Sequence, residues 1–343
     1  MKSKIKRSVL HALRSLGFFS LARYLTRKRL RILAYHVISV DDQYVFEDIL
    51  FMRPDTFRRR MQLLKKWGFP VLSLRDAVDG LAAQTLPDDA LAITIDDGWY
   101  TTFSEQVPAL RELGFPATIY VTSYYVEKGT EIFNVFARYA FWKVQAGALA
   151  LADVDLNLTG TFDLSKQDDR NSALAAILKR GDQLDAPGRQ NLVAALASRL
   201  NLDFPRILKS RMFQLVSADE IRNWNVPGID LQLHTHRHQL SKVEQSHLEM
   251  EIRENRVSLE RLGLPQPLDQ FCYPSGVHDR RQGGWLRDLG IHNATTCLPG
   301  FNDEKTDKYF LKRFLDREKI SDIEFQAEMF GVMEFFRMAR NLL

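Results

Sequence analysis

The sequence has few of the features that mark secreted, disulfide-bonded or membrane-spanning proteins. Only two cysteines, Cys272 and Cys297, occur among 343 residues, so we expect neither a disulfide framework nor a zinc site built on cysteine. The longest charge-free stretch near the N-terminus is SLGFFSLA, between Arg14 and Arg23, far short of the roughly 20 apolar residues that span a bilayer. No secretory signal with a small-residue cleavage site is recognisable. These absences predict a cytoplasmic protein.

Acidic residues are missing from the first 40 positions, which hold ten lysines and arginines. The rest of the chain therefore has 37 of the 47 basic residues against all 43 acidic ones. This mildly acidic balance argues against a broad nucleic-acid surface, and we expect no nucleic-acid partner. Hydrophobic residues (45%) and charged residues (26%) occur in the proportions of a globular protein with a full core.

Residues 1–30 combine these cations with leucines and phenylalanines at helical spacing, which predicts a basic amphipathic helix. Two interpretations stay open. In one, the helix lies on an anionic membrane surface, at the inner face of the cytoplasmic membrane, with its apolar side chains among the lipid tails. In the other, the helix packs on the main domain and presents a solvated basic face.

Strand and helix patterns alternate along most of residues 31–343, which we treat as one domain. Apolar runs predict buried strands, and amphipathic segments between them predict helices, at 30–38, 55–66, 90–98, 103–114, 116–122, 228–234 and 241–262. This alternation predicts an α/β fold built on parallel strands, with functional residues at the strands' carboxyl ends. Between about 130 and 215 the rhythm gives way to a hairpin-like stretch and helical segments, which indicate a largely helical insertion.

Three of the eight histidines lie within GIDLQLHTHRHQL at 228–240, directly after a strand pattern. His234 and His238 are four residues apart, so a helical turn or a compact loop would bring both imidazoles to one side. His236 alternates with this pair and is expected to be exposed rather than a ligand. Another strand pattern ends in TIDDG, which places Asp96 and Asp97 at a strand end as well.

Two neutral imidazoles and one carboxylate suit Zn²⁺ or a similar divalent ion and leave a coordination position open. In an Asp-Asp pair, one carboxylate can bind the metal while its neighbour acts as a base. Each pattern alone is weak evidence, because a lone HxxxH is often surface decoration and Asp-Asp-Gly is common in turns. Their occurrence at two strand ends predicts a metal-dependent hydrolytic site.

TIDDG at 94–98, HTHRH at 234–238 and FCYPSG at 271–276, in this order, resemble the motifs of the polysaccharide deacetylases, also called NodB-homology or carbohydrate esterase family four domains. The resemblance covers about residues 31–125 and 214–315. It implies a distorted β/α barrel and one divalent metal ion, Zn²⁺ first and Co²⁺ or Ni²⁺ as alternatives. The implied reaction removes an acetyl group from an N-acetylated glycan, either a bacterial surface polysaccharide or its lipid-linked sugar precursor.

The resemblance also implies roles for single residues. Asp96 would be the catalytic base, and the metal ligands would be Asp97, His234 and His238. The third motif departs from the family pattern, because Cys272 stands where an arginine would orient the base. Arg313 would then supply this cation, and the backbone N–H of Ser275, which replaces a tyrosine, would serve as the oxyanion donor. No residue matches the family's histidine general acid.

Several alternatives remain at this point. His36 either lines the pocket or is a packed core histidine, and Trp99 either stacks on a sugar ring or is buried. The departures in the third motif leave other functions open, namely removal of an O-acetyl or formyl group from a lipid-carried sugar, or glycan binding without catalysis. A membrane-docked scaffold is a further alternative. The intact Asp96, Asp97, His234 and His238 favour an enzyme.

Overall fold

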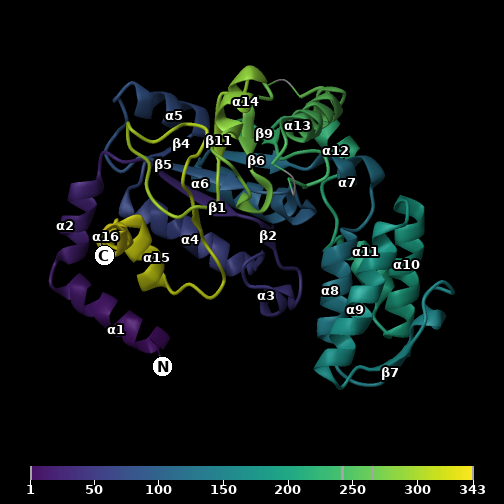
Figure 1. Cartoon of the computed structure of the whole chain (residues 1–343). Helices are drawn as coiled ribbons and strands as arrows, with labels where there is room; N and C mark the ends of the chain where they lie inside the picture. The colour runs from purple at the N-terminus through teal and green to yellow at the C-terminus, as the bar shows by residue number, and fades with distance from the viewer. Residues whose placement is uncertain (1, 241–242, 265, 342–343) are drawn as a thin grey trace.

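The computed structural model describes residues 2–240, 243–264 and 266–341. Its centre is a curled parallel sheet in which the strands follow the order β11-β10-β9-β6-β5-β1-β12, and β4 pairs with the start of β5 (Figure 1). The strands of this sheet are β1 (Arg31–Tyr35), β4 (Val71–Leu72), β5 (Leu91–Ile95), β6 (Ala117–Val121), β9 (Ile229–Leu233), β10 (Gln270–Cys272), β11 (Asn293–Thr295) and β12 (Phe314–Leu315). The predicted distorted β/α barrel is confirmed as an open, curled half-barrel of α/β type.

The central strands are buried on both faces. Every residue of β1, β5 and β6 is buried, as expected for apolar runs in a parallel sheet covered by helices. Local signals set the ends of the covering helices. For example, Pro54 occupies the first turn of α4, and Gly68 closes the helix with a left-handed φ of 71°. The helices and helical turns of the main body, apart from the two terminal segments, are α3 (Gln43–Phe46), α4 (Pro54–Trp67), α5 (Leu74–Ala82), η1 (Thr102–Gln106), α6 (Val107–Leu113), α7 (Ser123–Lys128), α12 (Ala218–Arg222), α13 (Gln245–Glu260), η3 (Pro274–Gly276) and α14 (Gln282–Asp288).

The segment between β6 and β9 leaves the sheet. These two strands pair directly over five residues, from Ala117↔Ile229 to Val121↔Leu233, so the chain between them forms a separate helical body beside the half-barrel (Figure 1). Its elements are α8 (Phe133–Lys143), β7 (Ala148–Ala150), η2 (Leu151–Asp153), β8 (Thr161–Asp163), α9 (Gln167–Asp182), α10 (Ala186–Arg199) and α11 (Phe204–Ser210). Strands β7 and β8 form the hairpin-like antiparallel pair. We call residues 130–215 the insertion.

The N-terminal segment forms two helices rather than one. Helix α1 (Lys2–Ser15) and helix α2 (Phe18–Thr26) are separated at Gly17, whose φ of 78° is left-handed. Both pack beside the C-terminal helices α15 (Asp322–Met329) and α16 (Val332–Asn341). The prediction of a single amphipathic helix is therefore wrong at Gly17, where the backbone turns out of the right-handed helical region.

Aromatic and ionic contacts hold this helical pair on the main body. The Phe18 ring lies 5.9 Å from the Phe335 ring, and the Phe19 ring lies 6.3 Å from the Phe330 ring.

A parallel pair of short strands, β2 (Val37–Ile38) and β3 (Phe51–Met52), completes the fold. Among the described residues, none of the helices is long and apolar enough to cross a membrane.

Candidate metal centre and catalytic site

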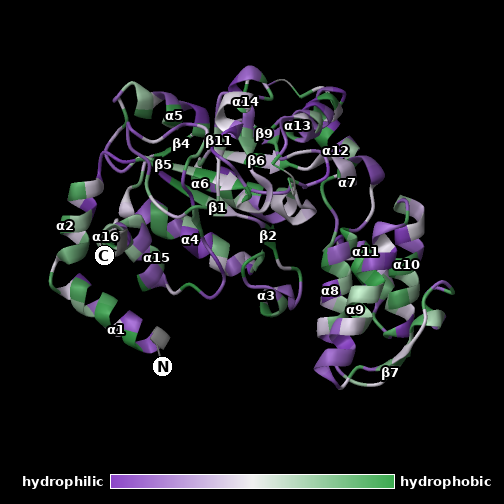
Figure 2. Cartoon of the chain, in the orientation of Figure 1, coloured by the Kyte–Doolittle hydropathy of each residue, from purple (hydrophilic) through white to green (hydrophobic). Residues whose placement is uncertain are grey.

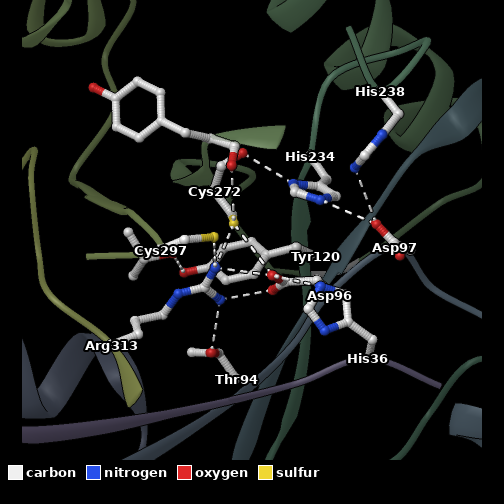
Figure 3. A network of polar contacts seen from close by, with 12 residues as sticks. His36, Thr94, Asp96, Asp97, Tyr120, His234, His238, Cys272, Cys297 and Arg313 are labelled. Carbon is white, nitrogen blue, oxygen red and sulfur yellow. Dashed lines mark hydrogen bonds and ion pairs between the residues drawn. The ribbon is translucent and has the colours of Figure 1, made fainter. Parts of the chain in front are cut away.

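Parallel pairing brings the two predicted motifs to one edge of the sheet. Asp96 and Asp97 follow β5, and His234 follows β9, while β6 lies between these strands and pairs with both. The carboxyl ends of parallel strands meet at the same edge, so residues far apart in the sequence converge there. Figure 3 shows the side chains of these residues pointing toward one another.

Asp97, His234 and His238 form a cluster with the dimensions of a zinc site. The Asp97 Oδ1 lies 3.2 Å from His234 Nε2 and 3.3 Å from His238 Nε2, and all three ligand atoms fall within 4.8 Å of one another. A tetrahedral zinc ion with bonds of about 2.0–2.1 Å places its ligand atoms about 3.3 Å apart. The donor set and its spacing therefore fit one divalent metal ion held by these three residues.

Hydrogen bonds orient two of the three ligands. The His234 Nδ1 lies 2.9 Å from the backbone oxygen of Cys272, so this nitrogen carries the proton and leaves Nε2 free to bind a metal. The indole N–H of Trp99 donates to Asp97 Oδ2 at 2.9 Å, which leaves Oδ1 facing the histidines. Trp99 is 2% exposed, so the interpretation as a sugar-stacking face is not supported and the buried alternative holds.

The backbone is in the left-handed region at several site residues. Asp97 has φ 75°, Thr235 has φ 66°, His238 has φ 57° and Ser275 has φ 54°. Such angles cost about 1–3 kcal/mol each in residues with a side chain and concentrate at functional sites. Four such residues in the three motifs indicate that the loops keep an unfavourable backbone conformation because it positions the side chains of the site.

Asp96, next in sequence to Asp97 of this three-residue cluster, is paired with Arg313. The guanidinium binds both carboxylate oxygens, with Nη1 2.7 Å from Oδ1 and Nη2 2.8 Å from Oδ2. Both side chains are buried. Burial alone would raise the pKa of Asp96, but the charge and hydrogen bonds of Arg313 outweigh it and hold the pKa below its usual range. Asp96 is therefore ionised at neutral pH.

Arg313 is itself fixed by surrounding groups. Its Nε donates to the Thr296 backbone oxygen at 2.8 Å, and its Nη1 donates to the Thr94 hydroxyl at 2.9 Å. The Nη2 also lies 3.1 Å from Cys272 Sγ (Figure 3). The structure thus places Arg313, the residue directly before β12, next to Cys272, which stands where the sequence motif would have a cation.

A second group of possible metal ligands, Asp96, His234 and Cys272, has a different character. Burial raises the pKa of the Cys272 thiol well above its usual value, so the thiol stays protonated and is a poor metal ligand. Both oxygens of Asp96 are already bound by Arg313. Of the two groups, the Asp97–His234–His238 cluster is therefore the better candidate for a metal site.

The remaining histidines near the site differ in their environment. His236 is buried, and its Nδ1 lies 2.8 Å from the Ser123 hydroxyl, so the expectation that it is exposed is wrong. Thr235, directly before it, has a left-handed φ of 66°, so the strand alternation on which the expectation rested does not continue to His236. His36 lies beside the base, with Nε2 3.7 Å from Asp96 Oδ2, and burial lowers its pKa, which favours the neutral ring.

Asn255 of α13 is a positioning residue that the sequence patterns did not reveal. Its Oδ1 accepts from the His234 backbone N–H at 2.9 Å, and its Nδ2 donates to the Val121 backbone oxygen at 3.0 Å. It therefore ties the end of β9 to the end of β6. A lone asparagine within a charged helix carries no motif, so only the fold could assign this role.

Ser275 lies apart from the side-chain cluster. It is exposed on the η3 turn, three residues beyond the Cys272 carbonyl that binds His234. Among the described residues, no group accepts a hydrogen bond from the Ser275 N–H. The assignment of this N–H as an oxyanion donor stays a prediction.

A pocket of about 280 Å³ opens beside the Asp97–His234–His238 cluster. Asp97 and His238 line one side, and the side chain of His238 is 38% exposed. Several wall residues belong to the insertion, namely Ile132, Phe133, Asn134, Val135, Asp182, Arg189 and Leu215. The insertion therefore forms part of the wall of the cavity that would receive a substrate.

Comparisons with known proteins agree with this architecture. A family model described as polysaccharide deacetylase matches residues 83–154, a stretch that contains TIDDG. The resemblance to polysaccharide deacetylases is confirmed. The histidine motif lies outside the matched stretch, and it is the structure that joins the two motifs. No curated protein sequence matches the chain.

Solved structures of deacetylases share the fold. The Streptococcus pyogenes deacetylase PplD in complex with acetate is 16% identical, with a TM-score of 0.58 over 88% of this chain and 98% of that one. IcaB from Ammonifex degensii is 15% identical, with a TM-score of 0.54 over 88% and 97% of the two chains. A de-N-acetylase from Aggregatibacter actinomycetemcomitans is 15% identical, with a TM-score of 0.54 over 88% of this chain and 99% of that one.

Proposed function

We propose that this protein is a metal-dependent hydrolase that removes an N-acetyl group from an amino sugar of a bacterial surface polysaccharide or its lipid-linked precursor. The observation that carries the proposal is the convergence of Asp97, His234 and His238 on one point, with the ionised Asp96 next in sequence to a ligand. The family match and the shared fold support a glycan as the substrate.

The chemistry divides between the metal and the chain. A divalent ion held by Asp97, His234 and His238 would supply a Lewis acid for the acetamide carbonyl and for the attacking water. Asp96 accepts a proton from that water, because it is ionised and adjacent to the ligand Asp97. Arg313 holds the carboxylate of Asp96 in one orientation. The water oxygen forms a bond to the carbonyl carbon, the C–N bond breaks, and the leaving nitrogen takes up the proton that was removed from the water, so that the products are acetate and a free amine.

The pocket supports a sugar as the group that is bound. Its wall combines apolar side chains such as Phe133 with polar groups such as Asp182 and Arg189, a mixture typical of small-molecule sites. The Arg189 Nε donates to the Gly181 backbone oxygen at 2.8 Å, which fixes the side chain at the wall of the pocket. Asp182 and Arg189 are suited to bind sugar hydroxyls, and so the insertion would decide which sugar is accepted.

The direct test is an acetate-release assay on N-acetylated hexosamine oligosaccharides. Metal is removed from the protein with a chelator, and samples are reloaded separately with Zn²⁺, Co²⁺ and Ni²⁺. Acetate and free amine are then measured, and we expect them in equal amounts. The Asp96→Asn variant should keep its metal and lose activity by a factor on the order of 10² to 10⁴, the usual contribution of a general base. A metal-loaded protein that binds the glycan without releasing acetate would instead favour a binding domain.

A further inference from the structure

The two N-terminal helices are apolar on two sides. One side faces the main body, where Leu10, Phe19 and Ala22 are buried. The other side faces solvent and carries six large apolar side chains that are 49–81% exposed. We call this second side the outer face, and its residues are Ile5, Val9, Leu16, Leu21, Tyr24 and Leu25.

The spacing of these residues shows that they form continuous stripes. Ile5 and Val9 are four positions apart and lie on one face of α1, and Leu16, seven positions after Val9, follows directly after the end of this helix. Leu21 and Leu25 are separated by four positions on α2. Figure 2 shows the apolar and polar residues of α1 in alternation and a largely apolar α2. Single exposed apolar residues are ordinary, but six within 21 positions form a patch of the kind that marks an interaction surface.

The same segment stays cationic despite its ion pairs with the main body. Lys6 and Arg7 share Glu324, and Arg27 and Lys28 share Asp88. Arg23 and Arg31 share Asp89, and Arg29 contacts Glu334. Four acidic side chains thus form ion pairs with seven basic side chains. Nine of the ten cations of residues 1–40 precede the buried Arg31, and they outnumber these carboxylates, so the segment keeps an excess of positive charge.

We propose that the outer face of α1 and α2 docks on the surface of an anionic lipid bilayer. Exposed leucines beside uncompensated cations match both components of such a surface, the acyl chains and the negative headgroups. A second copy of this chain is a poorer occupant, because a symmetric contact would bring two cationic segments together. The helices would lie in the plane of the headgroups, since neither is long enough to span the bilayer. This docking does not depend on the proposed catalytic activity.

The test uses the full chain and point variants. Deleting residues 1–28 would expose Phe330 and Phe335, which pack against Phe19 and Phe18, so a truncation would confuse docking with folding. The docking variant combines Val9→Ser, Leu16→Ser and Leu21→Ser. The control variant combines Leu156→Ser, Met250→Ser and Val257→Ser, which removes exposed apolar side chains at 42–91% exposure elsewhere.

Sedimentation with vesicles gives the readout. The wild-type protein should bind phosphatidylcholine vesicles that contain phosphatidylglycerol, bind vesicles of phosphatidylcholine alone much less, and be partly released by high salt. The docking variant should bind at least about tenfold more weakly, because three inserted side chains are lost, while the control variant binds like the wild type. Both variants should keep the wild-type unfolding temperature.

Other results would overturn the proposal. These are a wild-type protein that ignores the anionic vesicles, equal binding to both vesicle types, or equal loss in the two variants. A concentration-dependent dimer that the docking variant abolishes, seen by light scattering without lipid, would assign the outer face to a second copy.

Discussion

Replacing Arg313 by leucine should expose the electrostatic cost of the buried base. Arg313 makes two short bonds to Asp96, and neither side chain has access to solvent. Removing one partner of such a pair leaves an uncompensated charge in the interior and typically costs 3–5 kcal/mol, so we expect Arg313→Leu to lower the free energy of unfolding at pH 7 by about this amount. Urea denaturation in the presence of a chelator measures it without a contribution from bound metal.

A double-mutant cycle separates the charge pair from the other contacts of Arg313. The side chain also binds the Thr296 carbonyl and the Thr94 hydroxyl, and these contacts are lost whether or not Asp96 is present. Asp96→Asn removes the uncompensated charge, so the double variant should be more stable than the sum of the single losses predicts, by about 2–3 kcal/mol. Additive losses, within about 0.5 kcal/mol, would refute a coupled buried pair.

The same substitution should shift the pH dependence of activity. Burial raises the pKa of Asp96, and Arg313 is the first of the groups that lower it, so the pKa should rise in Arg313→Leu. Because the base acts in its ionised form, the acidic limb of the kcat/KM profile should move to higher pH. An unchanged acidic limb would remove Asp96 from the role of base.

Three further predictions concern groups around the site and at the N-terminal helices. Trp99→Phe removes the N–H that binds Asp97 and should weaken metal affinity about 10–100-fold, as measured by competition with a fluorescent chelator; unchanged affinity would contradict the orienting role. Arg189→Ala should raise KM for the glycan with unchanged metal content, and an unchanged KM would remove the insertion from substrate binding. Hydrogen bonds and the nearby Lys6 lower the pKa of Glu324 to about 2 against the effect of burial, so its contribution to stability is present above the unfolded pKa of about 4.3 and is lost as the pH falls toward 2. Glu324→Gln should therefore destabilise the protein at pH 7 and much less at pH 2, and an equal loss at both values would contradict this linkage.

The sequence was sufficient to predict the central strands β1, β5, β6 and β9 and the two motifs at the carboxyl ends of β5 and β9. Apolar patterns identify these strands, and a parallel sheet brings their carboxyl ends together, so the aspartate pair and the histidine pair could be placed together from the sequence. The choice of Asp97 rather than Asp96 as a metal ligand came only from the resemblance. Arg313 could be placed near Asp96 only through the resemblance, since no local pattern marks it. The structure supplies the physical reason. Strand β1 pairs with both β12 and β5, so Arg313, directly before β12, can reach across β1 to Asp96, directly after β5.

Other features depend on backbone angles and packing that a sequence pattern does not encode. His236 was expected to be exposed because alternation was assumed to continue past the strand, but the left-handed residues Thr235 and His238 change the direction of the chain. The break of the N-terminal helix follows from the left-handed angle of Gly17, although glycine alone does not require a break. Asn255 positions His234 from a distant helix, and such a contact is visible only in three dimensions.

Metal stoichiometry in two histidine variants tests the central claim most directly. His238 contributes a ligand atom 3.3 Å from Asp97 Oδ1, whereas His236, two residues earlier, is bound to Ser123 instead. The purified His238→Ala protein should therefore lose most of its metal, and His236→Ala should retain one ion per chain, as measured by elemental analysis after identical reloading with Zn²⁺. Equal metal content in the two variants, or loss in His236→Ala alone, would contradict the Asp97–His234–His238 site.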